Sequence, residues 1–332
     1  MENKRSGCPR DNIALVLLIL FLGISIVYAA GKFEPPDGKT LLLIGQNQES
    51  MDTYVKEFKT IPAGFMLYTD LEKCTGLSEP FDCGSGTMYG QHLVDNYPGT
   101  VIQIGLYMVD MLDDALAGNY DSSIDRLGRW MAAAKRPIFL RIGYEFDGPH
   151  NHYDPQKYVR AYRYIVDRLR KNHLENVAFV WHSYASYPVY MSKQQSDYYP
   201  GDEYVDWFAV SFFDNSASSV PMSKMLAMAK EHGKPLMLAE ATPAHIGVSG
   251  GKQAYFRWYR PLFKFIDKNN VKMLCYINTD WDSQPMFADG NWKDSRVQSN
   301  SEIRKIWLDE ISKDRYLKYS IDLYNLLGMG NK

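Results

Sequence analysis

The sequence predicts an α/β fold, a single (β/α)8 TIM barrel that follows an N-terminal leader. Eight short apolar runs are spread along the chain, and most are separated by segments with helical periodicity. The runs are almost continuously hydrophobic, as expected of parallel strands buried on both faces. Setting the leader aside leaves about 300 residues for a fold that typically takes about 250. Eight alternating units favour a closed barrel over a doubly wound sheet.

The leader is predicted at residues 1–29. Lys4, Arg5 and Arg10 precede an apolar stretch at 13–27, and Val27 and Ala29 supply small residues for cleavage after Ala29. The stretch extended to residue 30 is just long enough to span a bilayer, so an uncleaved signal anchor is the alternative. In either case we expect residues 30–332 outside the cytosol, secreted or membrane-anchored.

The predicted strands and helices follow in order along the chain. The strands are expected at residues 40–44, 64–68, 101–107, 137–143, 177–181, 205–211, 235–239 and 271–277. Asp154 and Pro155 predict the start of a helix, and Asp121 the start of another. Gly233 predicts the end of the helix before the seventh strand. We find no repeat or long linker and expect no second domain.

Composition narrows the function. The net charge is −2, and no basic run follows the leader, so nucleic-acid binding is not expected. Cys74 and Cys83 flank a turn-rich loop and predict a disulfide in an oxidising compartment. Cys275 lies in an apolar strand and is expected to be a buried free thiol. Neither a metal site nor a cofactor is expected from the motifs present.

Two of the apolar runs stop at a carboxylate, Glu145 after the fourth run and Glu240 after the seventh. In a parallel barrel the C-terminal ends of the strands face the active site. Two glutamates brought there by different strands are typical of a retaining glycosidase, in which one acts as acid/base and the other as nucleophile. Each could instead be an ordinary exposed charge at a strand end; the order of the elements favours the catalytic interpretation.

Around these glutamates the sequence resembles glycoside hydrolase family 26. Residues 140–148, Leu-Arg-Ile-Gly-Tyr-Glu-Phe-Asp-Gly, are similar to the family motif Leu-Arg-x-x-His-Glu-x-Asn-Gly, and residues 234–240 are similar to its nucleophile strand. Segments 154–170, 177–183 and 198–207 add to a resemblance over residues 139–307. It implies a retaining enzyme with Glu145 as acid/base and Glu240 as nucleophile. The substrate it favours is β-1,4-mannan, with a β-1,3- or mixed-linkage glucan or xylan as the alternative.

Three positions depart from the family pattern. Tyr144 replaces a histidine that contacts sugar, and Asp147 replaces an asparagine. Phe213 stands where the sixth strand usually provides a tyrosine that hydrogen-bonds the nucleophile. Loss of this donor should leave Glu240 more basic and less well oriented unless another hydroxyl, from Tyr276 or Tyr187, bonds it.

The remaining predicted site residues lie at strand ends. Arg141 falls inside a buried strand, where an unpaired charge is costly, so it should pair with one of the carboxylates. Side chains at the ends of the fifth and eighth strands are candidates for contact with sugar: Trp181, His182, Asn278 and Trp281. For Trp281 simple packing is the alternative, and for Trp181 a place in the wall or core is favoured. We expect a monomeric β-glycanase acting on a polysaccharide. A barrel that binds carbohydrate without cleaving it is the alternative from another class.

Overall fold

Eight parallel strands close into a barrel, as predicted. The computed structural model describes residues 31–172, 174–186, 194–213 and 218–330. Each strand pairs with the next, and β1 pairs with both β8 and β2, which closes the ring. The strands are β1 (Thr40–Gly45), β2 (Gly64–Asp70), β3 (Val101–Tyr107), β4 (Ile138–Ile142), β5 (Val177–Ser183), β6 (Trp207–Phe212), β7 (Leu236–Ala241) and β8 (Met273–Ile277).

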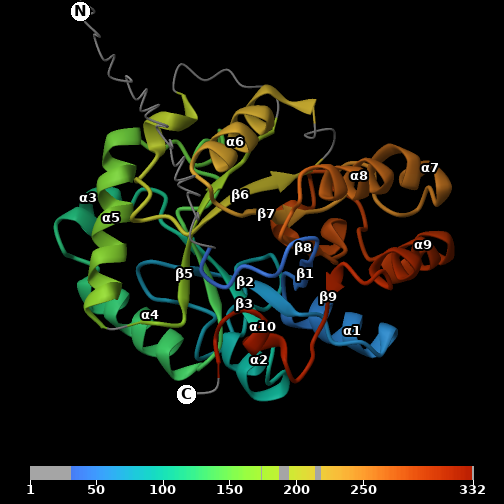
Figure 1. Ribbon diagram of the computed structural model, residues 1–332, viewed down its shortest axis with the longest axis horizontal. Helices are drawn as coiled ribbons and strands as arrows, with labels where there is room; N and C mark the ends of the chain where they lie inside the picture. Colours follow the sequence, from blue (N-terminus) through green and yellow to red (C-terminus); the bar gives the residue numbers. More distant parts are fainter. Residues whose placement is uncertain (1–30, 173, 187–193, 214–217, 331–332) are drawn as a thin grey trace, which may run out of the picture.

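Helices surround the strands (Figure 1). Asp154 caps α5, accepting a 2.9 Å hydrogen bond from the Lys157 amide, and α4 begins at Asp121, as predicted. None of the described helices is both long and apolar enough to cross a membrane, and the predicted leader lies outside the described residues. The helices are α1 (Gln48–Phe58), α2 (Gly90–Asn96), α3 (Leu112–Leu116), α4 (Asp121–Ala133), α5 (Pro155–Lys171), α6 (Val220–Glu231), α7 (Lys252–Ala254), α8 (Arg260–Lys268), α9 (Ser301–Ile311) and α10 (Leu323–Leu326).

The strands bury both of their faces, which explains their continuous hydrophobicity. On β1, Leu41 and Leu43 belong to the apolar cluster that fills the barrel. Leu42 and Ile44 belong to the larger cluster between the barrel and its helices. Successive side chains on a strand point to opposite faces, so each strand contributes to both cores.

The C-terminal segment covers one end of the barrel. Strand β9 (Tyr316–Leu317) adds in parallel to β1, and α10 follows it near the C-terminal end of the chain (Figure 1). The Tyr324 hydroxyl donates a 2.9 Å hydrogen bond to the Thr100 carbonyl, just before β3, and Leu323 and Leu327 join the inner cluster. This closes the end where the strands begin. The cleft described below lies at the opposite end.

The predicted disulfide between Cys74 and Cys83 is wrong, because the structure holds both as free thiols. Cys74 is buried against α4, and its thiol donates to the Ser123 carbonyl at 3.4 Å. Cys83 is exposed, with its sulfur 3.4 Å from the Ser85 hydroxyl. One thiol is therefore part of the core and the other lies at the surface. Cys275 is buried and free, as predicted.

Candidate active site

A cleft of about 860 Å³ opens where the strands end. Both predicted catalytic glutamates line it, with Glu145 only 5% and Glu240 only 7% exposed. Its wall is rich in aromatic and methionine side chains, which suits the apolar faces of sugar rings. These side chains are Tyr68, Phe81, Met88, Tyr107, Met111, Tyr144, Tyr184, Phe213, Trp281, Met286, Phe287 and Trp292.

A β-bulge aims Glu240 into the barrel. Leu236 and Leu238 belong to the outer core, so regular alternation would send Glu240 outward as well. The pairing of β7 with β6 shifts by one residue after Leu238, which places Glu240 opposite Ser211. Ser211 follows Trp207 and Ala209 along the inward row of β6. Bulges commonly re-aim side chains beside active sites, and here the bulge brings the carboxyl into the cleft.

A buried glutamine from β3 supports the bulge. Gln103 is fully buried in the barrel, and its amide donates a 3.3 Å hydrogen bond to the carbonyl of Ala239, the residue before Glu240. A bulge disrupts the regular ladder of backbone hydrogen bonds, so a side-chain donor at this carbonyl stabilises the local distortion.

Glu145 sits on a tight turn directly after β4. Its φ of 52° and the φ of 56° at Gly143 lie in the left-handed region, which is costly for a residue with a side chain. The side-chain amide of the buried Asn151 donates to the backbone carbonyls of Tyr144 and Glu145 at 2.8 and 2.9 Å. The Gly148 amide donates to the Glu145 carbonyl at 2.7 Å. These hydrogen bonds stabilise the turn that points the Glu145 side chain toward the cleft.

Arg141 pairs with the nucleophile candidate, as the burial argument predicted. Its guanidinium is fully buried and forms an ion pair with Glu240 across the barrel. It also lies against the rings of Tyr68 and Tyr144, 5.0 and 5.2 Å from their centroids. The positive charge of Arg141 therefore lies below the cleft, next to Glu240 and against two aromatic rings.

A hydrogen-bonded chain runs from Arg141 to Glu145 through His182 and Ser211. Burial, and then the charges of Arg141 and His150, hold the pKa of His182 well below its usual value, so the ring is neutral. Arg141 donates to His182 Nδ1 at 3.2 Å, which leaves the ring proton on Nε2 to donate to Ser211 Oγ at 3.0 Å. The Ser211 hydroxyl then donates to Glu145 Oε1 at 2.5 Å. The two carboxyls are thereby fixed in one network.

Opposing influences act on the ionisation of Glu240. Burial and the negative charge of Glu145 raise the pKa of Glu240, whereas the ion pair with Arg141 and a hydrogen bond from Tyr68 lower it; the net direction is upward. The contribution of Glu145 is upward because its negative charge disfavours a second negative charge on Glu240. The guanidinium favours the anion at Glu240.

Phe213 replaces the tyrosine that usually bonds the nucleophile, and Tyr68 provides a hydroxyl in its place. Its side chain hydrogen-bonds Glu240 from β2, on the side of the barrel opposite the usual donor strand. Tyr276, one of the two predicted substitutes, belongs to the outer core, where its hydroxyl meets Tyr259 at 2.7 Å. Tyr187, the other, lies outside the described residues. Sequence reasoning missed Tyr68 although it stands two positions after the inward-facing Met66.

Replacing Tyr68 by phenylalanine should move the acidic limb of kcat/KM to higher pH. The hydroxyl stabilises the Glu240 anion, so its removal raises the pKa of Glu240 and delays ionisation of the nucleophile. A hydrogen bond to a charged group contributes about 1.5–3 kcal/mol, so we expect a loss of roughly ten- to hundredfold below the optimum. Rates measured across pH for both proteins test this. A limb that stays in place would separate Tyr68 from the nucleophile.

Five of the eleven predicted site residues line the cleft: Tyr144, Glu145, Phe213, Glu240 and Trp281. Trp281 is held in place by its indole N–H, which donates to Thr242 Oγ1 at 2.9 Å. The other six are buried and do not line the cleft; among them, Trp181, His182 and Asn278 were predicted to contact sugar. They are Arg141, Asp147, Trp181, His182, Tyr276 and Asn278.

Asp147 and Trp181 stabilise the structure around the cleft through hydrogen bonds and ring stacking. The Asp147 carboxylate accepts hydrogen bonds from the Ser183 hydroxyl at 2.6 Å, the Tyr184 amide at 2.7 Å and the Gln195 amide group at 3.0 Å. It therefore ties the turn after β4 to the end of β5. Trp181 stacks on Phe146 with ring centroids 4.5 Å apart, facing the outer core.

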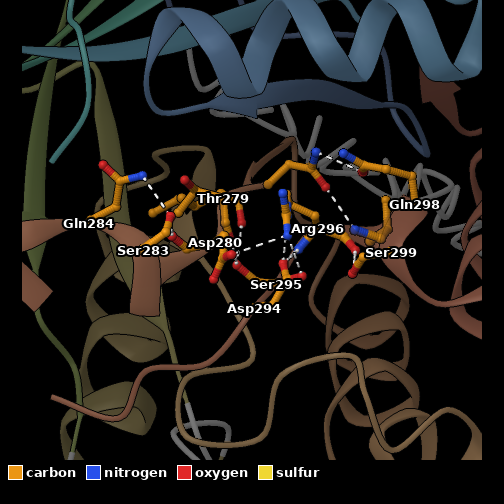
Figure 2. A network of polar contacts seen from close by, with 12 residues as sticks. Thr279, Asp280, Ser283, Gln284, Asp294, Ser295, Arg296, Gln298 and Ser299 are labelled. Carbon is orange, nitrogen blue, oxygen red and sulfur yellow. Dashed lines mark hydrogen bonds and ion pairs between the residues drawn. The ribbon is translucent and has the colours of Figure 1, made fainter. Parts of the chain in front are cut away.

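Asn278 belongs to a polar network that holds the loops after β8. Its side-chain oxygen accepts from the Val297 amide at 2.9 Å, and its amide group donates to Gln298 at 3.0 Å. Figure 2 shows Arg296 between Asp280 and Asp294, which it meets at 3.2 and 2.9 Å. The network fixes the segment from which Trp281 reaches the cleft.

A (β/α)8 barrel that presents two buried glutamates from β4 and β7 on one aromatic cleft has the form of a glycoside hydrolase. The sequence profile of glycosyl hydrolase family 26 matches residues 118–283. The chain belongs to this family and is a glycoside hydrolase, as the motifs predicted.

Two relatives and one solved structure illustrate the likeness. The β-1,3-xylanase TXYA of a Vibrio species is 30% identical over 326 residues, covering 91% of this chain and 70% of the relative. A β-1,3-xylanase of an Alcaligenes species is 29% identical over 323 residues, covering 90% and 68%. The structure of a GH26 β-mannanase from Bacteroides ovatus aligns with a TM-score of 0.63 at 13% identity, covering 86% of this chain and 93% of that one. This structural likeness supports the barrel fold.

Proposed function

We propose that this protein is a retaining β-glycanase that cleaves internal bonds of a polysaccharide by double displacement. The observation that carries the proposal is the ion pair of Arg141 with one of the two cleft glutamates, because it makes them chemically unequal. Glu240, stabilised as an anion, attacks the anomeric carbon while Glu145 protonates the leaving oxygen. Glu145 then takes a proton from the water that hydrolyses the glycosyl-enzyme.

The Glu145 carboxyl is oriented for this role by its two contacts. Oε1 accepts the Ser211 hydroxyl proton at 2.5 Å, so the transferable proton belongs on Oε2. Oε2 lies on the side of the cleft and meets His150 Nε2 at 2.8 Å. A general acid must reach the departing oxygen with its proton, and this arrangement leaves the proton-bearing oxygen at the cleft.

For the substrate we propose β-1,3-xylan. Both named β-1,3-xylanases are about twice as similar in sequence to this chain as the mannanase structures, at 30% and 29% identity against 13% and 14%. The replacement of the family histidine by Tyr144, whose ring lines the cleft, further weakens the case for mannan. The β-1,4-mannan favoured by the sequence motifs is the alternative, followed by mixed-linkage glucan.

We also propose that residues 1–29 direct the barrel out of the cytosol, by cleavage after Ala29 or as an anchor. The basic residues before the apolar stretch and the small residues after it support this. An insoluble polysaccharide is accessible only to an enzyme outside the cell. N-terminal sequencing of the exported protein distinguishes the two forms: a start at Ala30 indicates cleavage, and an intact leader in the membrane fraction indicates the anchor.

Hydrolysis of a polysaccharide panel tests activity and substrate together. Residues 30–332 and their Glu240→Gln variant are incubated with β-1,3-xylan, β-1,4-xylan, β-mannan and mixed-linkage glucan, and reducing ends and product lengths are recorded. We expect the parent alone to release a ladder of oligosaccharides from β-1,3-xylan. Release from mannan instead would replace the substrate proposal. Equal binding by both proteins without release would indicate a carbohydrate-binding barrel.

A further inference from the structure

The turn after β4 places a second titratable group directly on Glu145. His150 Nε2 lies 2.8 Å from Glu145 Oε2, the oxygen to which the proposed function gives the transferable proton. The Glu145 side chain is 6% exposed, whereas that of His150 is 49% exposed. The imidazole therefore joins a buried acid to the solvent side of the cleft.

The local backbone is arranged to permit this contact. A Cβ at Gly148 would lie 2.7 Å from His150 Cε1 and 3.1 Å from its Nε2, so only glycine leaves room for the ring to fold back over Glu145. The backbone N–H of Asn151 donates to the Gly148 carbonyl at 3.0 Å and closes the same turn. The Tyr184 ring meets the imidazole edge-to-face, 5.4 Å away, and fixes its plane.

The charges around His150 are mostly negative. Burial lowers the pKa of His150, but the hydrogen bond and charge of Glu145, followed by the charges of Glu240 and Asp147, raise it above the usual value. His182, on β5, is a basic group whose own pKa is lowered by the charge of His150, and it is neutral. The site therefore favours a proton in the contact between His150 and Glu145.

We propose that His150 is a positioning residue that shares the transferable proton of Glu145 and keeps this acid competent toward higher pH; the proposal rests on the proposed function. Either Oε2–H donates to Nε2 or Nε2–H donates to Oε2, and the 2.8 Å contact accommodates both. In the first step one proton leaves the pair for the glycosidic oxygen as the bond to Glu240 forms. In the second step water returns one proton as it attacks C1. Two basic sites hold the last proton more tightly than one.

The pH profile of kcat/KM tests the role of His150 in catalysis. We expect His150→Asn to move the alkaline limb to lower pH by about one unit, a roughly tenfold loss above the optimum, and to move the acidic limb much less. Gly148→Ala, which pushes the ring aside, should give the same shift. An aryl glycoside with a leaving group of low pKa needs no acid, so its cleavage should hardly change.

His152 provides the matched control, because it pairs with Asp110 at 2.9 Å and its side chain is 62% exposed. His152→Asn should reproduce the parent profile. An alkaline limb that stays in place in His150→Asn, or a loss that is uniform across pH, would overturn the proposal.

A titration of the histidine rings by NMR tests the contact between His150 and Glu145 independently of the proposed function. Replacing Glu145 by glutamine removes the anion beside His150, so the pKa of His150 should fall, whatever glycan the protein cleaves. An unchanged His150 titration would overturn the shared proton. Inactivity of the parent on every glycan, with the expected fall, would overturn the proposed function alone.

Discussion

Replacing Glu240 by alanine is expected to abolish hydrolysis, with a loss on the order of 10⁴-fold or more in kcat. The variant lacks the only carboxylate aimed at the anomeric carbon by the β7 bulge among the described residues. Azide should then restore turnover of an activated aryl β-glycoside, because it enters the space that the carboxylate leaves. It attacks from the face opposite the leaving group and gives an α-glycosyl azide.

The Glu145→Ala variant is the counterpart of this experiment. The first step needs no acid when the leaving group is good, so the glycosyl-enzyme still forms on Glu240. Azide then attacks that intermediate and gives a β-glycosyl azide. The two variants should therefore yield opposite anomers, identified by the coupling constant of the anomeric proton. The same anomer from both, or the reverse assignment, would contradict the roles given to the two glutamates.

Replacing Arg141 by methionine should both destabilise and inactivate the protein. Breaking a buried ion pair leaves an uncompensated charge and typically costs about 3–5 kcal/mol in the free energy of unfolding. Here the remaining charge is Glu240, whose partner Arg141 is fully buried. Without the guanidinium the pKa of Glu240 rises further and the nucleophile is protonated at working pH. The destabilisation should shrink at acidic pH, where Glu240 is neutral in both proteins.

Denaturant unfolding at two pH values measures this effect. The double variant Arg141→Met with Glu240→Gln removes both charges of the buried pair, so it should regain most of the lost stability while staying inactive. Arg304→Met, which breaks an exposed pair with Glu57 on the surface, should cost at most about 1 kcal/mol. A double variant no more stable than Arg141→Met, or equal costs for the buried and exposed pairs, would contradict the account of the ion pair.

The barrel could be predicted because its strands are apolar on both faces. That same property hides which side chains point inward, since hydrophobic residues occupy both faces of such a strand. Tyr276 was therefore expected at the nucleophile although Met273 and Cys275 fill the inner row of β8 and leave it on the outer face. Tyr68 was missed for the same reason. Counting in twos from Met66 on β2 would have found it.

The geometry around the glutamates was less accessible to sequence reasoning. Arg141 could be predicted as a partner because a buried guanidinium requires a carboxylate. The bulge that turns Glu240 inward has no signature in Leu-Ala-Glu, and the contact of Gln103 with Ala239 joins residues far apart in the chain. The spacing of Cys74 and Cys83 allowed a disulfide but carried no information on which thiol is buried.

The anomeric configuration of the first product tests the central account most directly. In double displacement each of two steps inverts the anomeric carbon, so the sugar released from a β-linked substrate keeps the β configuration. Proton NMR during early hydrolysis of an oligosaccharide that the protein cleaves records the new reducing end before mutarotation. We predict the β-anomer first, followed by slow equilibration. Initial appearance of the α-anomer would mean direct attack by water and would contradict Glu240 as the nucleophile.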